Sequence, residues 1–191
     1  WLDDALVNFM AFRIQETYKS PHNLLINSLA AEVLAKVECS EEQKQDKFSN
    51  LLKFKEFDSL FDEEAVLSMP FFLRPNNHWI YVFISMRKRT VFFCDSFNPT
   101  GEDSAAATTY GNTIVSALQF EHRKRLLNGR LNQGNEFKFE DWKAMGLPVP
   151  LQLDGYNCGV FCILFMYRIM KNVATKRELS INHKREDLTS I

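Results

Sequence analysis

The stretch HWIYVFISMRKRTVFFCDSFNP, residues 78–99, limits the possible folds more than any other part of the chain. It holds two runs of β-branched and aromatic residues, Ile80 to Ser85 and Thr90 to Cys94, joined by the turn segment Met86 to Arg89. Both runs are apolar at successive positions, which is typical of strands that are covered on both faces. The sequence therefore predicts a β-hairpin buried in the middle of a sheet.

Helical and extended patterns surround this hairpin without regular βαβ alternation. A first helix is expected over residues 1–18, and its apolar positions at three- and four-residue spacing are Leu2, Leu6, Phe9, Met10 and Ile14. Further helices are expected at residues 30–37, from about Asn112 to Leu127, and at 158–172. Strands are expected at 23–29, at 65–75 with an interruption at Pro70, and at 136–145. These patterns predict an α+β fold with a central mixed sheet flanked by helices, and we expect residues 1–191 to form a single domain around one core.

Composition excludes several classes of protein. The 191 residues are 46% hydrophobic, and a chain of this length buries roughly 70% of its unfolded surface. The chain has 23 basic and 24 acidic residues, so its net charge is close to zero. No overall positive potential therefore attracts nucleic acid or an anionic membrane. The longest apolar stretch, Val160 to Met170, contains Arg168 and is too short to cross a bilayer. The chain opens on Trp1 without a signal-peptide pattern, and we expect a monomeric domain of a longer intracellular protein.

The four cysteines, at positions 39, 94, 158 and 162, contain no CxxC pair and no regular spacing. This argues against a zinc site and against a disulfide framework, so we expect reduced thiols. Another cluster, of basic residues at positions 123–125 and 130, is most simply the cationic end of a helix, with partner docking as the alternative.

His78 and Asp95 are separated by 17 positions but stand at matching ends of the predicted hairpin. If the two strands pair around the turn, the start of one lies beside the end of the other, and a His–Asp pair results. The simpler alternative is that His78 only begins a strand and Asp95 only opens a turn, as aspartate commonly does.

Cys158 stands where a polar, glycine-bearing loop enters an apolar helix. The unpaired N–H groups and the positive dipole end of a helix N-terminus favour a thiolate, which is the nucleophilic form. Gly155 and Gly159 leave both flanks of the cysteine without side chains, so that a substrate backbone can approach. Cys162 lies one turn deeper in the same helix and is expected to be an unreactive core residue.

Gln152 lies six residues before Cys158 in the same loop. Its side-chain amide and the backbone N–H of Cys158 can together donate hydrogen bonds to the oxyanion that forms during acyl transfer. The alternative is an ordinary exposed loop residue. In combination with His78, Asp95 and Cys158, the glutamine indicates a cysteine protease that needs no metal or cofactor.

These residues resemble a known family. The motifs HW at 78–79, DS at 95–96 and QLDGYNCGVF at 152–161 are similar to the active-site signature of the ubiquitin-like-protein-specific cysteine proteases, the SUMO- and NEDD8-processing group of the adenovirus-protease-like clan. The opening WLDD resembles the family's WLND motif, with Asp3 where asparagine is usual. The resemblance follows the order of elements along the whole chain, and it is loose at residues 40–60 and 100–139.

The resemblance implies a papain-like, adenovirus-protease-like fold with the nucleophile at the start of a buried helix. It implies that His78 is the general base for Cys158, that Asp95 orients His78, and that Gln152 belongs to the oxyanion hole. Trp1 and Trp79 match two aromatic residues that roof a narrow tunnel for the Gly-Gly terminus of the substrate. Asp4 also matches the family motif, and it either binds the substrate tail or caps the first helix.

We therefore expect a thiol isopeptidase that releases or matures a ubiquitin-like modifier in the nucleus or cytoplasm, or in a host cell if the protein is a bacterial effector. SUMO is the first choice of partner, because the opening motif and the approach DWKAMGLPVPLQ at 141–152 most resemble the SUMO proteases. NEDD8 or ubiquitin is the alternative. An acetyltransferase of the same clan and an inactive modifier-binding module are less favoured, because the tunnel tryptophans and all four catalytic positions are present. Residues 40–60 and 100–130 are candidates for contact with the modifier.

Overall fold

The computed structural model describes residues 2–36, 38–131 and 138–175. Within them, one five-stranded sheet follows the order of the chain. The three central strands run antiparallel, and each edge strand runs parallel to its neighbour. The strands are β1 (Asn23–Leu25), β2 (Val66–Leu73), β3 (His78–Ser85), β4 (Thr90–Cys94) and β5 (Lys143–Gly146). The mixed sheet of an α+β fold is thus confirmed.

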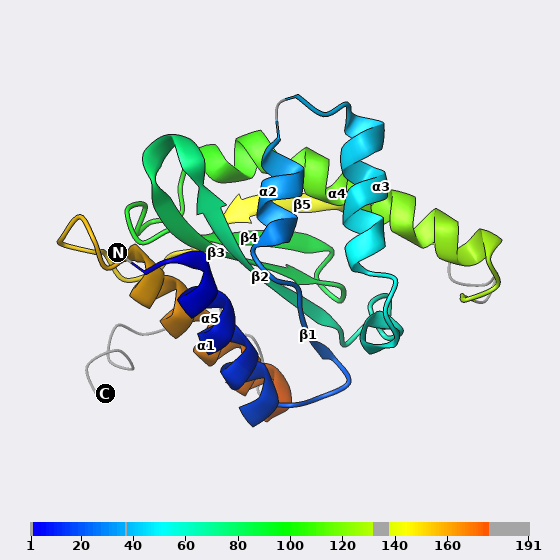
Figure 1. Ribbon diagram of the computed structural model, residues 1–191, viewed down its shortest axis with the longest axis horizontal. Coiled ribbons are helices and arrows are strands. Elements are labelled where there is room, and N and C mark those ends of the chain that lie inside the picture. Colours follow the sequence, from blue (N-terminus) through cyan, green and yellow to red (C-terminus); the bar gives the residue numbers. More distant parts are fainter. Residues whose placement is uncertain (1, 37, 132–137, 176–191) are drawn as a thin grey trace.

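In the described part of the chain, five α-helices cover the two faces of this sheet (Figure 1). Two of them, α1 (Asp4–Thr17) and α5 (Cys158–Ala174), pack together on one face. The other face carries α2 (Leu29–Ala35), α3 (Glu41–Leu51) and α4 (Ala105–Leu127). Single 3-10 turns are formed by Lys55–Phe57, Arg74–Asn76 and Phe139–Asp141.

The hairpin β3–β4 is buried at every position of both strands, as its sequence predicts. Side chains of β3 alternate between the two layers: Ile80 and Val82 face the α2–α4 side, whereas Tyr81 and Phe83 face α1 and α5. The sheet therefore divides the expected single core into two apolar clusters.

Pro70 does not interrupt β2, contrary to the sequence interpretation. The short strand β1 pairs only with Val66 to Ser68, so Pro70 lies beyond the end of that ladder, where a missing N–H costs little.

The start of α4 was also predicted wrongly. The helix begins at Ala105 rather than near Asn112, because Ser104 caps it by accepting a hydrogen bond from the N–H of Ala107 at 3.2 Å. Gly111 lies inside the helix where it passes β5. A Cβ built at this glycine would stand 2.3 Å from the Cβ of Ala144. Close packing therefore explains the glycine.

The apolar face expected for α1 is only partly the buried one. Val7, Ala11 and Ile14 are buried, whereas Leu6 and Phe9 are 43% and 58% exposed. The last helix, α5, was expected to be a buried helix. It instead packs between α1 and the sheet, and it leaves two of its apolar residues, Val160 and Leu164, about 40% exposed.

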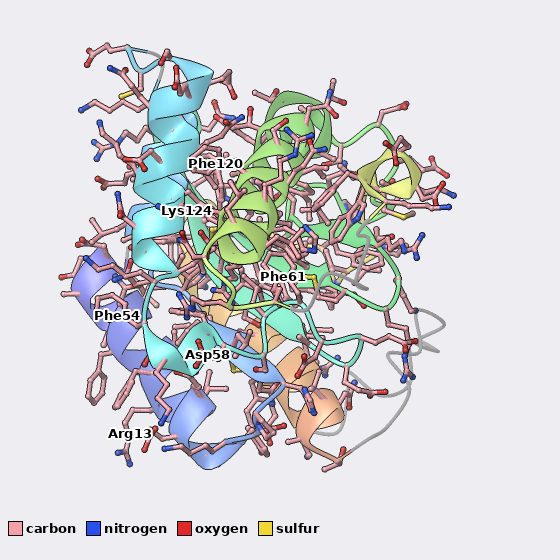
Figure 2. All side chains as sticks on the ribbon, turned by 90° about the vertical axis from the view of Figure 1, so that its right-hand side faces the viewer. Arg13, Phe54, Asp58, Phe61, Phe120 and Lys124 are labelled. Carbon is pink, nitrogen blue, oxygen red and sulfur yellow. The ribbon has the colours of Figure 1, made fainter. Side chains whose placement is uncertain are left out.

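Arg125 corrects the interpretation of the basic cluster, since this residue is only 2% exposed. Its guanidinium donates to Glu121 Oε1 at 2.6 Å and to the carbonyl oxygens of Phe57 and Leu52 at 2.6 and 2.9 Å. It also lies 5.3 Å from the ring centroid of Phe61. In Figure 2, Phe61 is labelled below α4, the helix that carries Arg125. Arg125 therefore ties α4 to the segment after α3 and is not a surface cation.

Candidate active site

His78 and Asp95 lie together at the end of the hairpin. His78 is the first residue of β3, and Asp95 directly follows β4. The Nε2 atom of His78 is 2.7 Å from Asp95 Oδ1, and the histidine is only 4% exposed. Asn77, in a left-handed conformation with φ of 49°, ends the preceding 3-10 turn, and β3 begins directly after it at His78. Hairpin pairing thus produces the His–Asp pair that the sequence suggested.

Cys158 is the first residue of α5, and only 2% of its surface is exposed. Burial by itself raises the pKa of a thiol. The interaction with His78 and the backbone N–H groups of Trp79 and Gly159 outweigh burial, so the pKa of Cys158 lies below its ordinary value. The helix N-terminus and the start of β3 therefore both stabilise the thiolate.

The pKa of His78 is shifted in the opposite direction, above its ordinary value. Burial lowers its pKa, but the hydrogen bond with Asp95 and the interaction with Cys158 raise it to about 9. Nδ1 of the ring makes no hydrogen bond of ordinary geometry with any described residue. Cys158 therefore acts on the imidazole through a looser contact than the bond to Asp95. Together the shifts favour a thiolate–imidazolium pair at neutral pH.

The other buried cysteines are in unreactive surroundings. Cys162 is 1% exposed and donates its thiol to the carbonyl oxygen of Ile80 at 3.2 Å. Burial raises the pKa of Cys162 and of Cys94. Cys158 is thus the buried cysteine whose thiolate is favoured, and all four cysteines are free thiols.

Gln152 is 3% exposed, so it is not the exposed loop residue of the alternative interpretation. Ser96 Oγ donates to its Oε1 at 2.8 Å, and the backbone N–H of Gln152 donates to the carbonyl oxygen of Ser96, also at 2.8 Å. Its Nε2 donates to the carbonyl oxygen of Asp154 at 2.8 Å and to Asp154 Oδ1 at 3.2 Å. The side-chain amide is therefore held between the segment after β4 and its own loop.

Asp154 organises this loop, and the sequence interpretation missed it. Its Oδ1 accepts from the backbone N–H groups of Tyr156 and Asn157 at 2.9 and 2.8 Å, and its Oδ2 accepts from Asn157 Nδ2 at 2.8 Å. These hydrogen bonds, led by the one from Tyr156, lower the pKa of the carboxyl group despite some desolvation. The signal was present, since an aspartate followed by glycine is typical of a side-chain-stabilised turn.

The predicted substrate-binding residues occupy different surroundings. Trp79 is 3% exposed, and its indole N–H donates to the carbonyl oxygen of Leu2 at 3.0 Å. Asp4 is exposed in the first turn of α1, while Asp3 caps the helix by accepting from the N–H of Leu6 at 2.8 Å. Trp1 lies outside the described residues.

Gly155 and Gly159 also differ. A Cβ built at Gly155 would meet nothing within 4 Å, so the space beside it is open. A Cβ at Gly159 would lie 3.0 Å from the Cβ of Leu2, which gives this glycine a packing role inside the protein. Approach of a substrate backbone to either glycine stays a prediction.

The described part of the chain contains no group of three or more histidine, cysteine or acidic side chains placed to hold a metal ion. Among the same residues, every helix is too short or too polar to span a bilayer.

Comparison with solved structures shows a shared fold. The SUMO protease Ulp1 with its catalytic cysteine oxidised to a sulfenic acid matches with a TM-score of 0.60 at 18% identity, over 98% of this chain and 71% of that one. A de-sumoylating protease matches with a TM-score of 0.65 at 16% identity, over 90% and 62%. The C-terminal Ulp1 protease domain in complex with Smt3, the yeast ortholog of SUMO, gives 0.58 at 20% identity, over 94% and 68%. No curated protein sequence matches the chain.

The family itself is shown by sequence. The model of the Ulp1 protease family, C-terminal catalytic domain, matches residues 1–189, which is nearly the whole chain. This match agrees with the mixed sheet, with the nucleophile candidate at the start of α5 and with the His78–Asp95 pair. The chain therefore belongs to the Ulp1 protease family and is a cysteine peptidase.

Proposed function

We propose that this peptidase is a thiol isopeptidase and endopeptidase that cleaves after the C-terminal Gly-Gly of a ubiquitin-like modifier, with SUMO as the first choice. The observation that carries the proposal is the convergence of three elements: β3 supplies His78, the end of β4 supplies Asp95, and α5 supplies Cys158. The complex of a similar protease domain with Smt3 supports SUMO as the partner.

In the proposed reaction, the thiolate of Cys158 attacks the carbonyl carbon of the terminal glycine. The protonated His78 then donates its proton to the leaving amine, which departs as the C–N bond breaks and leaves a thioester on Cys158. His78, now neutral, removes a proton from water as the water oxygen attacks the thioester carbonyl. The C–S bond then breaks, which releases the modifier with a free C-terminal carboxylate and restores the Cys158 thiolate beside protonated His78. Through its 2.7 Å bond to Nε2, Asp95 orients the His78 ring throughout and stabilises the imidazolium whenever His78 is protonated.

Gln152 and the backbone N–H of Cys158 would stabilise the oxyanion of each tetrahedral intermediate. The fixed position of Gln152 supports this role. Its side-chain amide is held by Ser96, which follows β4, and by Asp154, which lies on the loop that leads to Cys158. An amide held in advance loses little entropy when it donates to the oxyanion, which is the requirement for such a donor.

The substrate tail is proposed to enter beside Trp79, which directly follows His78, with Trp1, Asp4, Gly155 and Gly159 as further contacts. A tunnel between aromatic faces admits an extended chain only where side chains are absent, so it would select a Gly-Gly terminus.

The body of the modifier needs a broader surface, for which two segments were candidates. In Figure 1, α3 lies at the opposite end of the molecule from the start of α5. The N-terminal half of α4 lies at the end where α5 begins. This arrangement favours the first half of residues 100–130 over residues 40–60 as the contact with the modifier.

Activity-based probes made from SUMO, NEDD8 and ubiquitin test the proposal. We expect the SUMO probe to form an adduct with Cys158, and the Cys158→Ala variant to form none. If no probe reacts, the hydrolase function is wrong and a binding module remains. Reaction with the NEDD8 or ubiquitin probe alone would reassign the modifier. Incubation with labelled acetyl-CoA tests the acetyltransferase alternative, for which we expect no transfer.

A further inference from the structure

Phe97 lies directly over the ring of His78. The two ring centroids are 4.5 Å apart and the ring planes are inclined by 23°, which is a stacked geometry. The backbone N–H of Phe97 also donates to Asp95 Oδ1 at 2.9 Å, the same oxygen that is 2.7 Å from His78 Nε2. One residue thus contacts the imidazole with its side chain and the carboxylate with its backbone.

The hairpin explains why Phe97 stands there. The β3–β4 ladder pairs Tyr81 with Cys94, and continuing the same register by three residues sets position 97 opposite position 78. The turn after β4, closed by the Asn98 N–H on the carbonyl oxygen of Asp95 at 2.9 Å, keeps Phe97 close to the strand end.

Phe97 is not explained by core packing, because it belongs to neither apolar cluster and is 50% exposed. An aromatic face attracts a cation that lies against it, and it also covers that face of the imidazole from water. The titratable groups that act on His78 are Asp95 at the end of β4 and Cys158 at the start of α5. Phe97 is uncharged, and it acts on His78 through the negative face of its aromatic ring.

We propose that Phe97 is a positioning residue that holds the His78 imidazole in the orientation serving both Asp95 and Cys158 and favours its charged form. The inference rests on the proposed function, in which the thiolate–imidazolium pair is the resting state. It adds Phe97 to His78, Asp95, Gln152 and Cys158, as a side chain that acts through His78.

Alkylation of Cys158 by iodoacetamide as a function of pH tests this without any modifier substrate. The Cys158 peptide is followed by mass spectrometry, and the acid limb of the rate profile reports the ionisation of the thiol. We expect Phe97→Ala to move this limb to higher pH by about 0.5 unit, because the imidazolium that stabilises the thiolate loses its stacked partner. At pH values within the limb this corresponds to about a threefold loss of rate.

Three further variants make the result specific. Phe97→Tyr keeps an aromatic ring and should keep the wild-type limb, whereas Phe97→Leu keeps apolar cover without a π face and should behave like Phe97→Ala. Phe12→Ala is the matched control, since Phe12 is 51% exposed on α1 and should leave the limb unchanged. Circular dichroism and thermal unfolding verify that each variant is folded.

The outcomes separate this inference from the proposed function. If the unmodified protein shows no ionised Cys158 below the ordinary pKa of a thiol, the proposed catalytic pair itself fails. If the limb is present but identical in the wild type and in the Phe97→Leu and Phe97→Ala variants, only the positioning role is overturned. A shift in the alanine variant but not in the leucine variant also overturns stacking as its cause.

Discussion

The indole N–H of Trp79 donates to the carbonyl oxygen of Leu2 at 3.0 Å, so the residue after His78 holds the segment that leads into α1. The side chain of Leu2 in turn fills the space beside Gly159, directly after Cys158. The N-terminal segment is thereby fixed against both strand β3 and helix α5, next to His78 and Cys158.

Substituting Gly159 by alanine tests this contact. Overpacking costs about 1–3 kcal/mol, while alanine in place of glycine in a helix gains about 1 kcal/mol, so we expect a small change in thermal stability. Activity should fall by about tenfold or more, because the N-terminal segment must move. The double variant Gly159→Ala, Leu2→Gly, which also removes the Cβ of residue 2, should recover part of kcat/KM. A double variant as inactive as the single one would contradict the packing explanation.

The pH profile of kcat/KM follows from the two pKa shifts. Activity should rise with pH through the lowered pKa of Cys158 and fall as His78 loses its proton near pH 9. Asp95→Asn removes the main group that raises the pKa of His78, so the alkaline limb should move from about 9 toward lower pH, and kcat should fall by about 100-fold or more. An unchanged alkaline limb in Asp95→Asn would show that another group titrates there.

The raised pKa of His78 also has a consequence for folding. A histidine whose pKa is higher in the folded than in the unfolded state stabilises the fold fully below about pH 6.5 and loses that contribution as pH rises through about 9. The lowered pKa of Cys158 acts in the opposite sense over the same pH range, because the thiol loses a proton on folding whereas His78 gains one. In a Cys158→Ala background, the free energy of unfolding should therefore fall as pH rises above about 6.5, relative to the same background with His78→Asn, as measured by urea titration at several pH values.

Asp154 should control the oxyanion donor without touching the substrate. Asp154→Ala releases Gln152 and two backbone N–H groups, so we expect kcat to fall by about tenfold or more while KM changes less. Asp154→Asn keeps an acceptor for the backbone but places one amide NH2 against that of Asn157. Adding Asn157→Asp restores a donor–acceptor pair, and the double variant should be more active than Asp154→Asn. Equal activity of both would exclude the Asp154–Asn157 bond as a cause.

Arg125 should matter for stability and not for chemistry. Arg125→Met leaves Glu121 and the carbonyl oxygens of Leu52 and Phe57 buried without their donor, which costs about 3–5 kcal/mol in the free energy of unfolding. Arg123→Met removes an exposed arginine two positions earlier and should change stability by less than about 0.5 kcal/mol. Denaturant unfolding measures both, and the pH profile of activity should stay unchanged. Equal stability of the two variants would contradict the role given to Arg125.

The sequence alone determined the parts of this protein that depend on local pattern. Two apolar runs around a short turn are enough to pair β3 with β4, and pairing brings His78 to Asp95 because strand ends meet in an antiparallel hairpin. A cysteine between a polar loop and an apolar run is likewise enough to place Cys158 at a helix N-terminus. The order of these motifs along the chain is also a property of the sequence alone, and it resembles that of the family.

Only the tertiary structure decided the contacts between elements distant in sequence. Position 111 in α4 has no room for a side chain because Ala144 of β5 packs against it. Arg125 is buried because the segment after α3 supplies carbonyl acceptors for its guanidinium. The stacking of Phe97 on His78 and the contact of Leu2 with Gly159 also require two segments to meet. The spacing of apolar residues predicts a helix at α1, but the neighbouring elements determine which of its apolar residues are buried.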